Sequence, residues 1–94
     1  MAITHYTGEL AGSVTAVQMP DVPCSRVRFK ARSDNAGSVY IGVAGVTAPD
    51  GTTDATTGLE LDAGDDTGFL YAANLNEFYR ISDNAGDDLT YLAE

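Results

Sequence analysis

Side chains alternate with a period of two residues between Cys24 and Arg32, and this alternation limits what the chain can fold into. The segment reads CSRVRFKAR. Successive side chains of a β-strand point to opposite faces of a sheet, so the segment predicts a strand with one apolar face and one charged face. The apolar face carries Val27, Phe29 and Ala31, and the charged face, the basic stripe, carries Arg26, Arg28, Lys30 and Arg32.

The rest of the chain also favours an all-β fold. No window of about a dozen residues has the 3.6-residue period of an amphipathic helix, whereas short alternating runs recur between turn-forming residues. We therefore expect a small β-sandwich or jelly roll of about seven to eight short antiparallel strands. The expected strands are ITHY, GSVTAVQM, CSRVRFKAR, SVYIGV, TGLELDAG, GFLYA, EFYRIS and DLTYLA. The expected core is Val27, Phe29, Val39, Ile41, Val43, Leu59, Leu61 and Leu89.

One pentapeptide, SDNAG, occurs twice, at residues 33–37 and 82–86. Asp and Asn accept hydrogen bonds from nearby backbone and Gly tolerates positive φ, so each copy predicts a hairpin turn with a bulge. The small, polar segment 46–58 predicts an exposed loop. No domain boundary is needed, so residues 1–94 are expected to form one domain. Within it, residues 1–19 are a candidate arm or strand that contacts a neighbouring subunit.

The charge balance limits the classes of partner. The chain has 14 acidic and 5 basic residues, which give a formal net charge of −9. Nucleic-acid phosphates repel such a chain, so nucleic acid is not an expected partner. The N-terminal segment has no signal-peptide pattern, and no apolar run approaches the ~20 residues of a membrane span. A lone cysteine fits synthesis in a reducing cytoplasm, and a small core without disulfides favours an oligomer.

Candidates for catalysis and metal binding are weak. Cys24 and His5 could form a nucleophile–base pair, but a buried thiol and an imidazole in a terminal segment are the simpler interpretation. Clustered Asp side chains could hold calcium, yet none of the turns matches the twelve-residue calcium loop, and turn hydrogen bonding explains them as well. We therefore predict no catalytic residue, no cofactor and no metal site. The clustered carboxylates are Asp50, Asp54, Asp62, Asp65, Asp66, Asp83, Asp87 and Asp88.

Two interpretations of the basic stripe stay open. Its cations could pair with Glu60 and Asp62 on a neighbouring strand, because these carboxylates have the same spacing of two residues. Alternatively, Arg26, Arg28, Lys30 and Arg32 could dock on a negatively charged protein partner. The two interpretations are compatible, since four cations exceed two carboxylates.

Several motifs taken together resemble small structural proteins of tailed-phage virions. They are MPDVPCSRVRFKAR, NAGSVYIGVAGVT, GLELDAGD, NLNEFYRIS and AGDDLTYLAE, and they cover roughly residues 17–94. In the family pattern, an opening with proline and cysteine leads into an alternating strand, and an aromatic strand and a short C-terminal strand close the chain. The acidic stretch LDAGDDTGFLYA departs from this pattern.

The resemblance implies a role in the virion rather than a chemical site. We expect a capsid decoration or cement protein that binds the major capsid protein on the outer surface of the capsid. It would be made in the host cytoplasm and act as a homotrimer, not as an enzyme. The alternative is a carbohydrate- or receptor-binding module of a head fibre or tail accessory, in which the five tyrosines would supply stacking faces.

Overall fold

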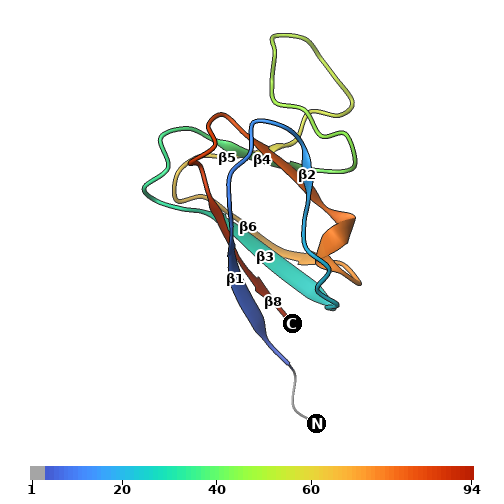
Figure 1. Ribbon diagram of the computed structural model, residues 1–94. Coiled ribbons are helices and arrows are strands. Elements are labelled where there is room, and N and C mark those ends of the chain that lie inside the picture. Colours follow the sequence, from blue (N-terminus) through green and yellow to red (C-terminus); the bar gives the residue numbers. More distant parts are fainter. Residues whose placement is uncertain (1–3) are drawn as a thin grey trace.

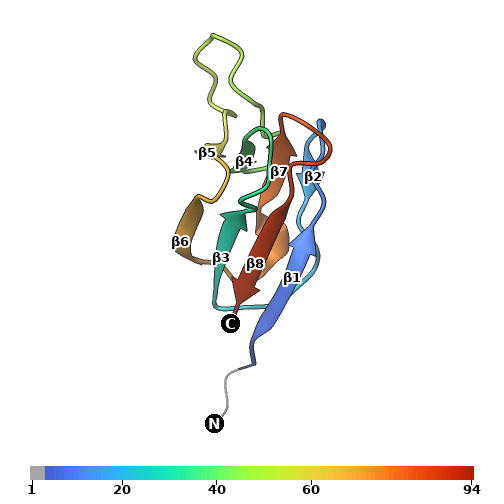
Figure 2. The ribbon, with the colours of Figure 1, turned by 90° about the vertical axis from the view of Figure 1, so that its left-hand side faces the viewer.

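Eight short strands form two antiparallel four-stranded sheets in the computed structural model, which describes residues 4–94 (Figure 1). Sheet A has the strand order β1-β8-β3-β6, and sheet B has the order β2-β7-β4-β5. Figure 2 shows sheet A in front of sheet B. The predicted small β-sandwich is therefore confirmed. The elements are β1 (Tyr6–Leu10), β2 (Val17–Gln18), β3 (Arg26–Ala31), β4 (Val39–Gly42), β5 (Leu59–Leu61), β6 (Asp66–Tyr71), the 3-10 helix η1 (Leu75–Glu77), β7 (Tyr79–Ser82) and β8 (Leu89–Ala93).

The alternating segment forms the inner strand β3, as its pattern predicts. Val27, Phe29 and Ala31 are fully buried, whereas the cations between them face outwards. The ring of Phe29 meets that of Phe78 edge to face, with 5.6 Å between the ring centres. This side of β3 thus anchors the core between the sheets.

Two residues of the expected core lie at the surface, which corrects the prediction. Val43 is 63% exposed because β4 ends at Gly42 and the chain turns back through Gly45, whose φ is +79°. Val46, only 2% exposed, packs there instead. Leu59 is 57% exposed because β5 is an edge strand and Leu59 lines a hollow between β5 and the start of β6. The other six expected residues are buried, and Leu10, Met19, Leu75 and Ala93 join them.

The two SDNAG segments are arches between the sheets, so the predicted hairpins are wrong. The first connects β3 of sheet A to β4 of sheet B, and the second connects β7 of sheet B to β8 of sheet A. Neither Gly37 nor Gly86 has positive φ. Paired strands are about 4.8 Å apart, whereas facing sheets are about 10 Å apart, so a chain that changes sheets needs an arch rather than a tight turn.

The carboxylate of Asp87 holds the two arches together. Its Oδ1 accepts hydrogen bonds from the backbone N–H groups of Ala36 and Gly37 in the first arch, each at 3.0 Å. Its Oδ2 accepts from the backbone and side-chain nitrogens of Asn84 in the second arch, at 3.0 and 2.9 Å. Asp87 is 1% exposed, so this clamp is shielded from water.

The N-terminal strand has a partner within its own chain. β1 pairs along its whole length with β8, from Tyr6 opposite Ala93 to Leu10 opposite Leu89. β1 therefore pairs without the help of a neighbouring subunit. Contact of residues 1–19 with a neighbouring subunit stays a prediction, and residues 1–3 lie outside the described part of the chain.

The segment 46–58 forms the predicted loop and projects from one end of the sandwich (Figure 1). Residues 49–57 are exposed, whereas Val46 at its start is buried. A bridge between Thr47 and Thr57 joins its two ends. Within residues 4–94, no helix has the length and apolar character needed to cross a membrane.

Candidate interaction surface

The outer face of sheet A brings the basic stripe beside carboxylates from several segments of the chain. Arg26 and Glu94 lie at one end of this face, and their side chains form a half-buried ion pair. Further along, Arg28 Nη2 lies 2.6 Å from Asp66 Oδ2 on β6. The hydrogen bond between these two groups lowers the pKa of Asp66 and raises that of Arg28.

The last two cations of the stripe differ in their partners. Arg32 Nη1 lies 2.9 Å from Glu9 Oε1 on β1, and its Nε lies 3.1 Å from Asp34 Oδ1. Lys30 has no carboxylate within salt-bridge distance among residues 4–94. Its exposed side chain lines a shallow hollow with Thr90 and Leu92 of β8. Lys30 is therefore the cation of the stripe that another molecule could engage without breaking an ion pair.

The prediction that the basic stripe pairs with Glu60 and Asp62 is wrong. β5 carries Glu60 and pairs with β4 in sheet B, on the other layer of the sandwich from β3. Asp62, which follows β5, accepts a hydrogen bond of 2.6 Å from the hydroxyl of Ser38. Internal pairing of the stripe is thus present, but its carboxylates come from β1, β6, the first arch and the C-terminal residue.

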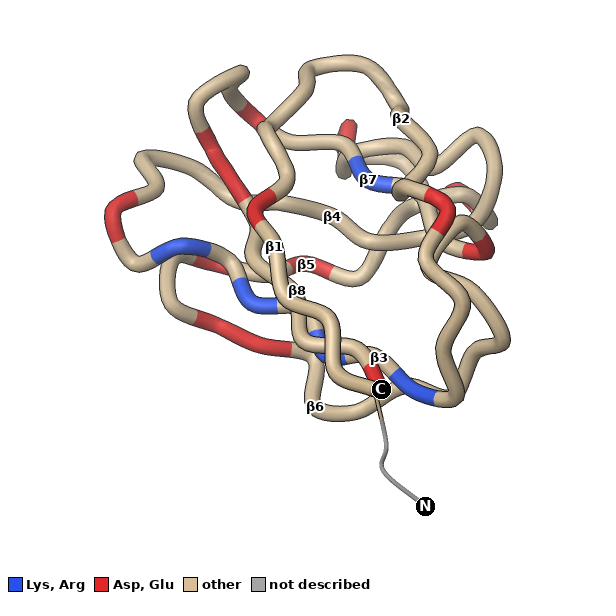
Figure 3. The backbone as a smooth tube through the Cα atoms, turned by 60° about the horizontal axis from the view of Figure 1, so that its bottom comes forward, with Lys and Arg blue, Asp and Glu red and all other residues tan. Residues whose placement is uncertain are grey.

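The stripe and its carboxylates form a surface without net charge, which we call the balanced-charge face. It carries four of the five basic residues and four carboxylates, so the remaining arginine and ten carboxylates account for the whole net charge of −9. Figure 3 shows basic segments along β3 and one on β7, the strand that contains Arg80, with acidic residues on turns and on several strands. The members of the face are Arg26, Arg28, Lys30, Arg32, Glu9, Asp34, Asp66 and Glu94.

Aromatic side chains of β6 extend this face at one end. Tyr71 is 89% exposed and lies opposite Arg26, and Phe69 lies opposite Arg28. The guanidinium of Arg26 lies over the ring of Phe69, 4.2 Å from its centre. We call Arg26, Phe69 and Tyr71 the aromatic–arginine cluster. Arg, Tyr and Phe are enriched in protein–protein interfaces, which makes this cluster a candidate anchor for a partner.

The structure does not bring Cys24 and His5 together as a nucleophile and a base. Cys24 donates from Sγ to the carbonyl oxygen of Ala72 at 3.3 Å, whereas His5 Nδ1 lies 3.3 Å from Glu94 Oε2. Burial, with a smaller contribution from the charge of Glu77, raises the pKa of the Cys24 thiol. The thiolate is the reactive form of cysteine, so this environment opposes reactivity.

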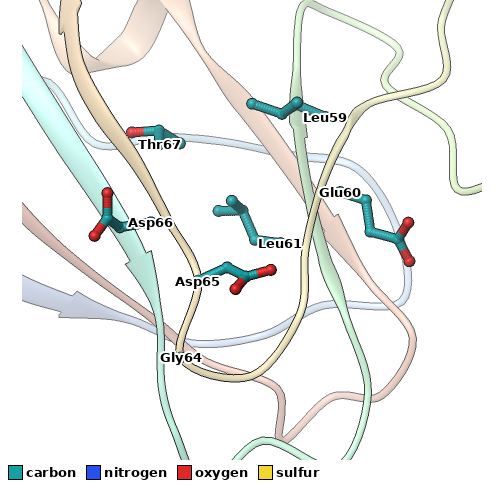
Figure 4. Close-up of a pocket in the computed structure, with 7 residues that line it drawn as sticks. All are labelled: Leu59, Glu60, Leu61, Gly64, Asp65, Asp66 and Thr67. Atoms are coloured by element: carbon teal, nitrogen blue, oxygen red, sulfur yellow. The ribbon is translucent and has the colours of Figure 1, made fainter.

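The acidic turns use their carboxylates on their own backbone. The turn between β5 and β6 lines a hollow with Leu61 and Thr67, and the side chain of Asp65 accepts a hydrogen bond there from the backbone N–H of Asp62 (Figure 4). Asp50 accepts from the backbone N–H of Thr52 in the projecting loop. No group of three or more His, Cys, Asp or Glu side chains is placed to hold a metal ion in the part of the chain that the structure describes.

The tyrosines do not gather on one surface. Tyr40 is buried, and Tyr91 packs against the core. Of the two exposed ones, Tyr6 lies on β1 and Tyr71 on β6, which are the opposite edges of sheet A.

Sequence reasoning located the basic stripe but missed the residues that complete the surface. The carboxylates could not be assigned because strand order is not readable from the sequence. The aromatic cluster left a usable signal, since Phe69 and Tyr71 are two residues apart and therefore share a face of their strand.

Comparisons with protein-family models, with curated protein sequences and with solved structures give no match.

Proposed function

We propose that this protein is a structural component of a tailed-phage virion, without enzymatic activity, that decorates the outer surface of the capsid. In this proposal its balanced-charge face binds the major capsid protein. The virion assignment rests on the resemblance of the sequence motifs to small phage structural proteins. The assignment of the binding surface rests on the distribution of charge and aromatic side chains over the fold.

The observation that carries the binding surface is the neutrality of one face on a strongly acidic molecule. Like charges brought together at an interface cost free energy and slow association. An acidic protein therefore approaches another protein surface with least repulsion through its neutral face. On this chain that face belongs to sheet A and spans its four strands.

The aromatic–arginine cluster would supply most of the binding free energy. Interface energy is concentrated in a few residues, with Trp, Tyr and Arg over-represented among them. Tyr71 is almost fully exposed on the isolated chain, so a partner that covers it removes a large ring from water. The ion pairs around it would fix orientation more than affinity.

Self-association is part of the proposal, but nothing in the described part of the fold favours the expected homotrimer over other oligomers, because β1 pairs with β8 of its own chain. The small core remains, and it favours oligomers without choosing the number of copies. The carbohydrate-binding alternative needs stacking faces that lie together. The two exposed tyrosines lie on opposite edges of sheet A, and Arg26 covers one side of the Phe69 ring, so the aromatic arrangement favours decoration.

Binding to capsids that lack this protein tests the proposal. Lys30→Ala and Tyr71→Ala are the informative variants, because neither breaks an ion pair among the described residues. Each is expected to weaken binding by about tenfold or more, which corresponds to the loss of one strong interface contact. Melting temperatures should stay close to that of the wild type.

Val14→Ala is the matched control. Val14 is 59% exposed and precedes β2 of sheet B, away from the balanced-charge face, so its truncation should leave binding unchanged. Wild-type binding by both Lys30→Ala and Tyr71→Ala would remove this face from the proposal. Failure of the wild-type protein to bind capsids at all would remove the decoration function itself.

A further inference from the structure

Four strands form the edges of the two sheets, and they differ in how well their open edges are protected. An open edge presents unpaired backbone groups to other strands, and proteins protect such edges by short length, bulges or charge. In sheet B, β2 has only two residues and β5 only three, so each offers few backbone groups to another strand. In sheet A, β6 is bulged: its register with β3 shifts between Arg28 and Lys30, and Gly68 has a φ of +67°.

β1 is the unprotected edge within residues 4–94. It has five residues in unbroken register with β8, and it contains no proline, lysine or arginine. Its single charged side chain, Glu9, is neutralised by Arg32 of the same chain. β1 can therefore accept another strand.

The backbone hydrogen bonds show which residues of β1 face its open edge. Arg26 and Glu94 exchange both of their backbone bonds, at 3.1 and 3.0 Å, so Glu94 directs its N–H and C=O groups towards β3. In an antiparallel ladder this direction alternates from one residue to the next, so residues 89, 91 and 93 of β8 bond to β1. Their partners in β1 have even numbers. Thr7 and Glu9 consequently direct their N–H and C=O groups to the open edge.

We propose that two copies of this chain pair through β1, antiparallel, about a twofold axis at Gly8. Thr7 of each copy then lies opposite Glu9 of the other, and the two pairs form four backbone hydrogen bonds. Sheet A of one copy continues across the axis into sheet A of its partner. This contact goes beyond capsid binding and does not depend on it.

A second copy fits this edge for three reasons. Thr7 and Glu9, whose backbone groups face the open edge, are symmetric about Gly8. The strand is therefore complementary to itself, as a twofold interface requires. Gly8 has no side chain to obstruct the closest approach at the axis, where facing Cα atoms are about 4.5 Å apart. β1 also borders the balanced-charge face, where two molecules of charge −9 meet with the least repulsion.

The side-chain pairs across the axis also favour a second copy of the chain as the partner of β1. Tyr6 of one copy lies opposite Leu10 of the other, so two apolar side chains are neighbours across the axis. Tyr6 is 42% exposed on the isolated chain, so the pairing would cover an exposed ring. Glu9 faces Thr7 and not another carboxylate.

Light scattering as a function of concentration is the first test. We expect a mass of twice 9.8 kDa at high micromolar concentration that falls towards the monomer on dilution. Thr7→Pro removes an N–H group at the open edge without removing a bond to β8, and is expected to raise the dissociation constant by about tenfold or more. Thr7→Ala keeps that N–H group and should dimerise like the wild type.

Amide hydrogen exchange of the wild-type protein gives an independent test that does not depend on a folded proline variant. The amides of Thr7 and Glu9 should exchange about tenfold or more slowly when the dimer is populated. The amide of Gly8, which bonds to β8, should be protected at every concentration. A monomeric or trimeric mass at high micromolar concentration would overturn the proposal. Exchange rates at the amides of Thr7 and Glu9 that do not depend on protein concentration would overturn the proposal as well.

Discussion

Replacing Asp87 by Asn tests the clamp that joins the two arches. The substitution keeps the shape of the side chain but replaces one carboxylate oxygen by an NH2 group. Either orientation of the amide turns that NH2 group towards two hydrogen-bond donors, the N–H groups of Ala36 and Gly37 or the two nitrogens of Asn84. Two of the four hydrogen bonds are therefore lost, and donors meet donors in their place.

The expected cost follows from those two bonds. A hydrogen bond to a charged group contributes about 1.5–3 kcal/mol, so two of them give about 3–6 kcal/mol. Two effects reduce this cost: a neutral amide is less costly to bury than a carboxylate, and water can reach the outer parts of the arches. We therefore expect the free energy of unfolding to fall by about 3 kcal/mol. A domain of 94 residues has a free energy of unfolding of roughly 5–14 kcal/mol, so the loss is large. The melting temperature should fall by about 12–24 °C.

Thermal and urea unfolding of Asp87→Asn, with Asp34→Asn as the control, provide the measurement. Asp34 undergoes the same chemical change in the other arch, but it is exposed and accepts only from Arg32, so its melting temperature should hardly move. A decrease of less than about 4 °C for Asp87→Asn, which corresponds to under 1 kcal/mol, would refute the argument that the arches depend on this carboxylate.

Three further perturbations have expected outcomes. Burial opposes ionisation of Asp87, but hydrogen bonds from Gly37, Asn84 and Ala36 outweigh it and lower its pKa. Its contribution to stability is therefore present above the unfolded pKa of about 3.9 and lost as pH falls through the folded pKa, so Asp87→Asn should flatten the acid limb of the melting-temperature profile. Gly12→Ala places a Cβ 2.3 Å from the carbonyl oxygen of Asp87 and should cost about 1–3 kcal/mol in urea unfolding. Phe29→Ala should cost about 3–5 kcal/mol in the same assay, and a smaller loss would contradict its place at the centre of the core.

The fold class was predictable because local alternation determines which side chains are buried. In β3 every second residue is apolar, and the structure buries those residues completely. The arches were not predictable in the same way. The SDNAG turns favour a reversal of the chain, but whether the next strand joins the same sheet or the opposite one depends on packing across the whole domain. The prediction that Val43 and Leu59 are buried was wrong for a related reason, since the sequence does not show where a strand ends or which strand forms an edge.

The candidate surface was predictable in its cations and not in its surroundings. Spacing alone places Arg26 to Arg32 on one outward face, because that inference needs only the strand period. The partners of Arg28 and Arg32 depend on which strands are neighbours, and here they come from residues 38 and 23 positions away. Equal spacing made Glu60 and Asp62 plausible partners, but the chain places them beside sheet B.

The projecting loop at 46–58 makes this small domain a candidate carrier for foreign peptides. Its ends are joined by backbone hydrogen bonds of 2.9 and 3.0 Å, from Thr47 N to the carbonyl oxygen of Thr56 and from Gly58 N to that of Thr47. A peptide inserted after Gly51 would leave these bonds and both sheets intact. Because the entropy of loop closure grows only with the logarithm of length, doubling the loop costs about 0.6 kcal/mol. A sandwich that tolerates such an insertion would present the guest sequence at the end of the molecule opposite Glu94 (Figure 1).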